Sequence, residues 1–399
     1  MSNNSFLYFI FIASSLSMLN NSLVQSPFIK TLIYGIMVLF EIKLFFFCKR
    51  NKFCGYRMGN VIVPLFFIMI SFAHSNYEPL WGLYIKYLGY VLCFIYGGII
   101  WYKDNIIIVN KKLLYITILS PLFLVGLFDH TPHKTIFYTL SNVYSFAGLC
   151  FGFYYYTVLY NKDNILRNSL FLILLYILSS STLGILVAFI LSFVYISRRN
   201  IKMIICCLLL FIVISILVLY TEIPVFARVK DVISVFGNMT KDDWYNIRDL
   251  NMWDISKDVD YSSDRTDNTS AIWRLSHWVA LIQDFLKYYY YSFIIGLGDS
   301  YTKEVLGNVP HNDYLRFLCE YGLVVFGYII YYMRHLLKTI KNDEVLIFIA
   351  AFLFYSISEN LINTFASNAI MYFCIGYHYE RCKNDITKPL NFRTLVLSR

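Results

Sequence analysis

Residues 169–196 read SLFLILLYILSSSTLGILVAFILSFVYI, and this stretch decides the topology of the chain. As a single helix it would be about 42 Å long at ~1.5 Å per residue, which is too long for a ~30 Å hydrocarbon core. Ser179, Ser180, Ser181 and Thr182 lie at its centre. Their side chains can bond the backbone groups that a turn leaves unpaired. We therefore expect two short spans, 168–180 and 183–197, joined by a tight turn.

The composition places the whole chain in a membrane. Hydrophobic residues make up 58% of the 399 residues and charged residues only 15%, whereas soluble domains carry about 25% charged residues. The 35 Phe and 35 Tyr suit long apolar spans with aromatic ends at the water interface. The formal net charge is +9, but the basic residues form short clusters between apolar runs. That arrangement indicates loops at a membrane surface and not a nucleic-acid-binding protein.

The apolar runs predict an all-α polytopic membrane protein with about twelve spanning helices. They cover roughly residues 5–20, 28–47, 60–74, 82–101, 113–127, 136–160, 168–180, 183–197, 203–221, 315–333, 345–358 and 364–379. The start of the chain lacks a basic region and a small-residue cleavage site, so it is expected to remain as the first span.

The distribution of basic residues supports the turn in the stretch 169–196. With this turn, 20 basic residues in the short loops and the C-terminal tail lie on one side of the membrane. The short loops on the other side contain only Lys30 and Lys134. Basic loops face the cytoplasm, and a single long helix would invert every later cluster. The sequence therefore predicts both termini in the cytoplasm.

The same count places one large loop, about residues 222–313, on the outer face. It holds 14 of the 25 acidic residues and four of the six Trp, and a polar segment of this length is usually functional. The predicted organisation is an N-terminal set of about nine spans (1–221), the large periplasmic loop (222–313), and the last spans with a basic tail (314–399). No internal repeat is visible, which does not favour the repeat architecture of secondary transporters.

The loop contains one helical pattern, TSAIWRLSHWVALIQDFLKYYYYSF, over residues 269–293. Its apolar residues recur at helical spacing, at Ile272, Leu275, Val279, Ile282, Phe285 and Leu286. We expect an amphipathic helix that lies on the membrane surface or packs across the bundle. Arg274 and Trp278 are four residues apart and would share one face. The following Gly296-Leu297-Gly298 predicts a turn.

Polar residues gather just before the next apolar run, in GNVPHNDYLRFLCEYG over residues 307–322. His311 can take up or orient a hydroxyl proton near neutral pH. An Arg nearby offers a planar fork for two oxygens of a diphosphate. Glu320 would lie within the membrane, where a carboxylate is costly without a partner. These residues also have purely structural interpretations: a solvated His311, an Arg274 whose charge reaches water, and an Arg316–Glu320 pair one turn apart.

Metal and disulfide chemistry have weak support. None of the nine Cys shows CxxC or Cys/His ligand spacing. Asp258 and Asp260 resemble the acidic pair of nucleotide-sugar enzymes, but they lie in an acidic loop without a strand pattern. Asp129, His130 and His133 are interpreted as a polar turn. No metal site is therefore predicted.

Three elements, in order, resemble the O-antigen ligase/polymerase family of bacterial inner-membrane proteins. The first is the pair of short helices broken by a Ser/Thr-rich turn, YILSSSTLGILVAFIL. The second is the loop segment with Arg274 and Trp278, followed by an apolar run and Gly296-Leu297-Gly298. The third is HNDYLRFLCEYGLVVFGYI, which resembles the HNxxL…ExG signature through His311, Asn312, Leu315, Glu320 and Gly322. The closing SENLINTFASNAIMYF is also similar, so the resemblance covers roughly residues 165–380.

The resemblance implies a GT-C-like, multispan glycosyltransferase that works without a metal or another cofactor. Its substrate would be an undecaprenyl-diphosphate-linked oligosaccharide at the outer face of the inner membrane, and membrane lipids and a chain-length regulator are candidate partners. His311 would activate or position the acceptor hydroxyl, and Arg274 would bind the diphosphate leaving group. The candidate substrate-binding residues are Arg228, Arg265, Trp278, Asn312, Asp313, Tyr314 and Glu320.

One position departs from the resemblance. Similar ligases carry an Arg at the Ser/Thr-rich turn, where this chain has Thr182. That difference, together with the HNDYL form and the Tyr-rich spans, favours an O-antigen polymerase. The alternatives are an O-antigen ligase or a capsule or exopolysaccharide polymerase and, from a different class, a lipid-linked glycan flippase. A transporter should carry ionisable groups near the middle of several spans, whereas here most gather in the outer loop.

Overall fold

The computed structural model describes residues 27–50, 81–104, 239–248, 269–287, 289–307, 309–340 and 343–387, with scattered positions between 5 and 237. Within these residues all regular structure is helical, and there are no strands. This agrees with the predicted all-helical fold class. Most of the span predictions between residues 105 and 221, including the turn at 179–182, lie outside the described residues.

Five predicted spans coincide with long helices. These are α2 (Pro27–Arg50), α4 (Trp81–Asp104), α16 (Asp313–Thr339), α17 (Asp343–Tyr355) and α18 (Phe365–Thr387). Among the described residues, three segments are long and apolar enough to cross a membrane: 31–50, 81–101 and 313–339. With 13 residues, α17 is shorter than a usual span. The structure is therefore that of a helical membrane protein.

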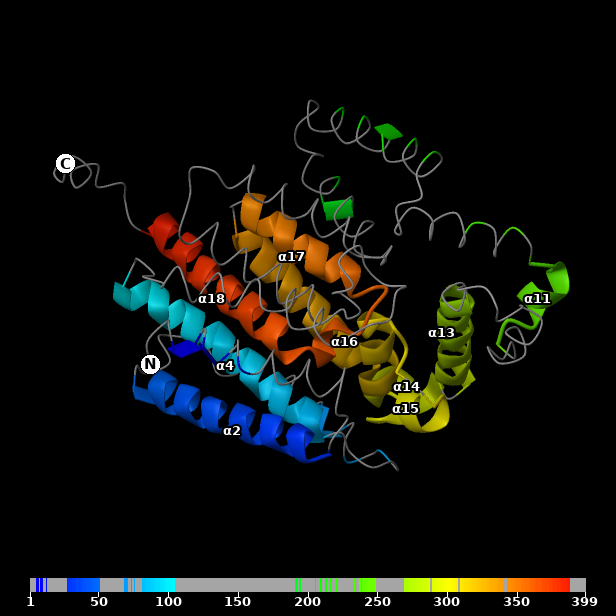
Figure 1. Ribbon diagram of the computed structural model, residues 1–399, viewed down its shortest axis with the longest axis horizontal. Coiled ribbons are helices and arrows are strands. Elements are labelled where there is room, and N and C mark those ends of the chain that lie inside the picture. Colours follow the sequence, from blue (N-terminus) through cyan, green and yellow to red (C-terminus); the bar gives the residue numbers. More distant parts are fainter. Residues whose placement is uncertain are drawn as a thin grey trace.

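The bundle is built around α4, which packs between α2 and α18 (Figure 1). Gly97 of α4 and Gly376 of α18 allow the two backbones to approach closely. A Cβ atom on Gly97 would lie 2.1 Å from the carbonyl oxygen of Phe373, and one on Gly376 would lie 1.9 Å from that of Phe94. Small residues at such crossings are a common device in membrane helix packing. Buried Phe and Tyr side chains, such as Tyr96 and Phe373, fill the space around this crossing.

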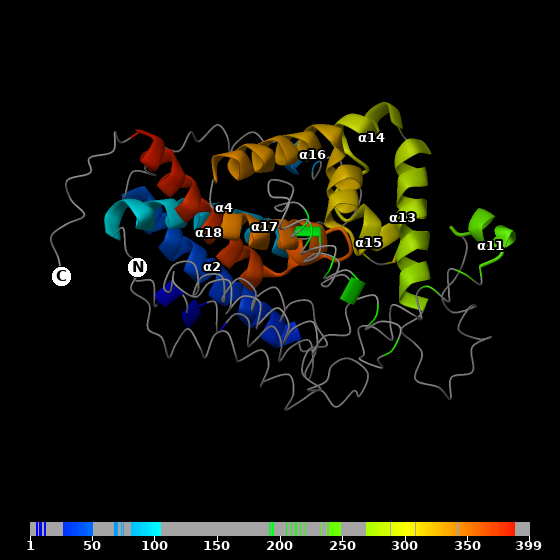
Figure 2. The ribbon, with the colours of Figure 1, turned by 90° about the horizontal axis from the view of Figure 1, so that it is seen from above.

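A second group of helices lies at one end of the bundle. It consists of α11 (Lys241–Tyr245), α13 (Thr269–Lys287), α14 (Tyr289–Ile295) and α15 (Tyr301–Val305). Seen from above, α13 runs across this end of the bundle (Figure 2). It packs against α16 and α14. The helix predicted over residues 269–293 is confirmed up to Lys287, and the rest of this segment forms α14.

The predicted apolar face of α13 is partly wrong. Phe285 is buried as expected, but Ile282 and Leu286 are 40% and 55% exposed. The buried face instead includes Ala280, Leu281 and the polar Ser276 and Asp284. The difference arises because polar partners hold this face: Arg248 donates to Asp284 Oδ1 at 2.9 Å, and the Tyr301 hydroxyl donates to Oδ2 at 3.1 Å. Hydrophobic spacing alone does not show such partners.

The Gly-Leu-Gly turn packs against a kink in α16. Gly322 has φ 80° and ψ 173°, so the helix is interrupted there. The carbonyls of Cys319 and Glu320 accept from Leu297 N at 2.7 Å and Gly298 N at 3.2 Å. A Cβ on Gly296 would lie 2.2 Å from the Glu320 carbonyl oxygen. The turn predicted at residues 296–298 is confirmed, and its role is to let the loop backbone lie directly on the first turns of α16.

Candidate functional site

His311 lies at the end of the segment that leads into α16. Asn312 caps this helix, because its side-chain oxygen accepts a hydrogen bond from Leu315 N at 3.0 Å. Asp313 N donates to the carbonyl of Ser356 at 3.0 Å, which ties the start of α16 to the end of α17. The cap and this bond fix the backbone on the C-terminal side of His311.

The Glu359 carboxylate joins the two residues that the sequence predicts as catalytic. Its Oε1 accepts from Arg274 Nη2 at 2.8 Å, and its Oε2 lies 2.7 Å from His311 Nδ1. Glu359 follows α17 in the turn before the short helix η4 (Leu361–Asn363). Its side chain is 5% exposed, against 25% for Arg274 and 35% for His311. Three segments far apart in the sequence thus meet at one buried carboxylate.

The contact with Glu359 assigns the His311 protons. A carboxylate only accepts hydrogen bonds, so His311 Nδ1 carries the proton that it donates. The other ring nitrogen, Nε2, then holds a lone pair in the neutral imidazole. A half-exposed His oriented by a buried carboxylate has the arrangement of a general base.

Trp273 limits the position of the His311 ring. The two ring centres are 5.3 Å apart at 70°, an edge-to-face contact. The ring centre of Trp273 is also 4.3 Å from that of His277, with the two planes tilted by 42°, and His277 Nε2 lies 3.1 Å from the Leu306 carbonyl oxygen. The first turns of α13 therefore support the His311 ring from one side.

Several buried polar atoms near Glu359 lack hydrogen-bond partners in the part of the chain that the structure describes. Arg274 Nε and Trp278 Nε1 belong to α13, Asn360 Oδ1 to the turn after Glu359, and Asp313 Oδ1 to the first turn of α16. Buried polar groups are usually paired, and isolated exceptions need an explanation. Because donors and acceptors occur together here, the site is suited to a polar ligand.

Asp313 and Tyr314 hold the turn that carries Glu359. Asp313 Oδ2 accepts from Ile362 N at 3.0 Å, and the Tyr314 hydroxyl donates to the Leu353 carbonyl at 3.0 Å. Asn368 donates to the carbonyls of Leu361 and Thr364 at 2.6 and 2.9 Å. Asp313 and Tyr314, which the sequence predicts to bind substrate, thus make these hydrogen bonds to the protein's own backbone.

Glu320 lies deeper than His311 and pairs with Arg316. Arg316 Nε donates to Glu320 Oε2 at 2.8 Å, and both side chains are at most 1% exposed. The Thr302 hydroxyl also donates to Glu320, and Arg316 Nη1 donates to Asn363 at 3.1 Å. The ion pair one turn apart, which the sequence offered as the structural interpretation, is thus present. It links α16 to α15 and η4.

Other predicted residues are not placed. Arg228, Arg265, Thr182, Asp258 and Asp260 lie outside the described residues, and so do Asp129, His130 and His133. Among the residues that the structure describes, no group of three or more His, Cys, Asp or Glu is suited to hold a metal ion.

Sequence reasoning missed the role of Glu359. A carboxylate near the end of an apolar run is costly without a partner, which was the available signal. Its partners could not be read from the sequence, because His311 and Arg274 precede it by 48 and 85 residues.

Comparison with known families gives one match, which covers part of the chain and does not include Glu359. Residues 168–332 match the family model of the O-antigen ligase. No curated protein and no solved structure matches the chain. The matched segment contains α13, the Gly-Leu-Gly turn, His311 and most of α16. The match supports the O-antigen ligase/polymerase family for this chain, without favouring a polymerase over a ligase.

Proposed function

We propose that this protein is an O-antigen polymerase that acts at the outer face of the inner membrane. It joins oligosaccharide repeat units that are carried on undecaprenyl diphosphate. The observation that carries the proposal is the Glu359 carboxylate, which contacts both His311 and Arg274. In this proposal His311 is the base for the acceptor hydroxyl and Arg274 is the cation that offsets the charge of the departing diphosphate.

His311 acts on the acceptor sugar. The acceptor hydroxyl oxygen bonds to the anomeric carbon of the growing chain, and its proton moves to His311 Nε2. The carbon–oxygen bond to the carrier diphosphate breaks, and the diphosphate oxygen keeps the electron pair. Glu359 accepts from His311 Nδ1 throughout, so it stabilises the imidazolium that forms.

Arg274 acts on the leaving group. Glu359 occupies one nitrogen of its guanidinium, while Arg274 Nε is buried without a partner in the described residues. An oxygen of the diphosphate would satisfy this donor, and the positive charge offsets the negative charge that develops on departure. Glu359 thus holds both groups at a fixed separation.

A ligase would use the same chemistry on a different acceptor. Thr182 replaces the Arg found at this position in similar ligases, which favours the polymerase. A flippase would not need a base held by a carboxylate at one end of the bundle. The acceptor is therefore the property that an experiment must identify.

Lipopolysaccharide from a strain deleted for this gene tests the proposal. A gel should show core carrying a single repeat unit, and the wild-type gene should restore the ladder. The His311→Ala variant should not restore it, although its amount in the membrane is normal. Bare core with long glycan on the lipid carrier would instead identify a ligase. Bare core with single repeats held on the inner face would identify a flippase.

A further inference from the structure

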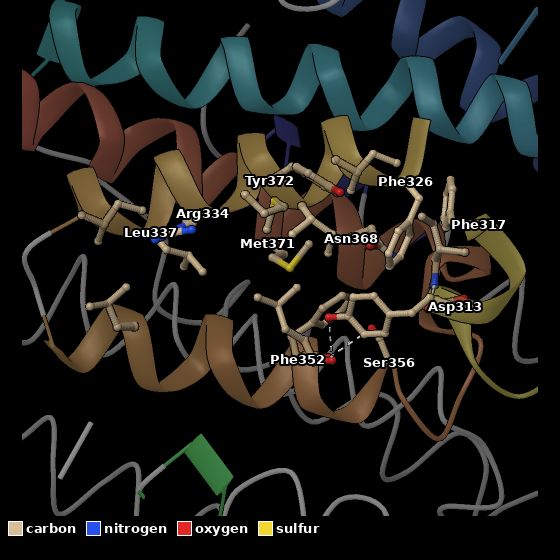
Figure 3. Close-up of a pocket in the computed structure, with 18 of the residues that line it drawn as sticks. Asp313, Phe317, Phe326, Arg334, Leu337, Phe352, Ser356, Asn368, Met371 and Tyr372 are labelled. Carbon is tan, nitrogen blue, oxygen red and sulfur yellow. Dashed lines mark hydrogen bonds between the residues drawn. The ribbon is translucent and has the colours of Figure 1, made fainter. Parts of the chain in front are cut away.

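A second feature lies outside the His311–Glu359–Arg274 site. A cavity of about 840 Å³ separates α16, α17 and α18 (Figure 3). Most of its wall is apolar and is made by side chains such as Phe326, Ile329, Met333, Phe352 and Met371. Water is poorly held by apolar walls. In a membrane protein a lipid chain is the natural content of such a space.

The two ends of the cavity differ in charge. Asp313, Ser356 and Asn368 line the end near the candidate site, and Arg334 and Lys338 line the other end. Asp313 and Arg334 are 21 residues apart on α16, and the helix changes direction between them at Gly322 (Figure 2). In the close-up, Arg334 lies at the opposite end of the cavity from Asp313 (Figure 3).

The two cations are available to a ligand. Arg334 and Lys338 make no ion pair or side-chain hydrogen bond within the described part of the chain. In Figure 3 the guanidinium of Arg334 points to the space between α16 and α17.

We propose that this cavity binds an anionic glycerophospholipid. Its phosphate contacts Arg334 and Lys338, and its acyl chains fill the apolar middle. Basic pockets between spanning helices are suited to such headgroups. The choice of a phospholipid over the carrier lipid rests on the proposed function, which places the carrier diphosphate at Arg274.

The position of the cations excludes the carrier lipid as the preferred occupant. Under the proposed function the carrier places its diphosphate at Arg274, which bonds Glu359 and does not line this cavity, and the carrier has no second anion for Arg334 and Lys338. A phospholipid can place its anion at these two residues. Charge therefore selects the phospholipid.

Native mass spectrometry of the full-length protein tests this site. The protein is titrated with phosphatidylglycerol and with phosphatidylcholine of the same acyl chains. We expect phosphatidylglycerol to bind at least about tenfold more tightly, since each nearby cation favours an anionic headgroup. In the double variant Arg334→Gln/Lys338→Gln this preference should disappear.

The matched control is Lys49→Gln/Arg50→Gln, which removes two exposed cations from the last turn of α2. It should keep the preference for phosphatidylglycerol. The narrowing variant Leu337→Trp, which retains both cations, should weaken binding of both lipids. Equal binding of the two lipids to the wild type would overturn the proposal, as would an equal loss in the control. Displacement of phosphatidylglycerol by polyprenyl phosphate would assign the cavity to the carrier instead.

Discussion

The Glu359 carboxylate is the residue on which the site geometry depends most. The Glu359→Gln variant keeps the size of the side chain but removes its charge. Its amide has one acceptor oxygen, whereas the carboxylate has one oxygen for Arg274 and one for His311. We expect glycosyl transfer to fall on the order of 10²-fold, at the lower end of the contribution of a general base. The rate is measured with purified enzyme and lipid-linked repeat units. Glu304→Gln, at an exposed carboxylate paired with Lys303, is the control and should be unchanged.

The role proposed for Arg274 gives a second prediction, because its guanidinium must contact Glu359 and the diphosphate at the same time. A Lys ammonium is a point charge and cannot reproduce the planar fork of Arg. Arg274→Lys should therefore lose activity on the order of 10²-fold, as enzymes do when a preorganised donor is removed. The measurement is the rate of release of the carrier diphosphate. A rate equal to that of the wild type would remove Arg274 from the leaving-group site.

The motif residues could be found from the sequence, whereas the carboxylate between them could not. His311 and Arg274 stand out because they lie in the two segments that resemble the O-antigen ligase/polymerase family, although each also has a structural interpretation. Their proximity depends on how α13 crosses the start of α16 and on the turn after α17. Both are tertiary features that local spacing does not contain.

The kink in α16 gives a prediction for this helix. Gly322 has a positive φ, and a Cβ there would lie 2.4 Å from the carbonyl oxygen of Ile294. Gly322→Ala should lower the free energy of unfolding by about 1–3 kcal/mol through backbone strain alone, with a further loss from the clash. Thermal unfolding in detergent measures the change.

Gly327, in the same helix, is the matched control. A Cβ on it would contact nothing within 4 Å, and Ala is a better helix former than Gly. Gly327→Ala should leave the stability unchanged or raise it slightly. If both variants lost the same stability, the kink would not be the cause.

Helix positions were easier to predict than helix faces. Long apolar runs located α2, α4, α16 and α18 because a spanning helix needs a continuous apolar segment. The buried face of α13 differed because Arg248 and Tyr301 hold Asp284 on the inside. The kink at Gly322 was also not predicted, since its cause is the backbone of residues 294–298, in a separate segment.

The topology of the entire chain rests on the turn at residues 179–182. Reporter fusions that are active only outside the cytoplasm test it. Fusions after residues 164 and 200 should both be inactive, and a fusion after residue 182 should be active. Opposite activities at 164 and 200 would show one long helix and would invert every later loop.

Polymerisation by the purified protein in lipid vesicles tests the central claim most directly. A single lipid-linked repeat unit serves as both donor and acceptor, and the products are separated on a gel. The wild type should convert the repeat unit into a ladder of longer glycans. The His311→Ala variant, folded and present in equal amount, should leave the repeat unit unchanged. A ladder of normal length and rate from His311→Ala would contradict the account.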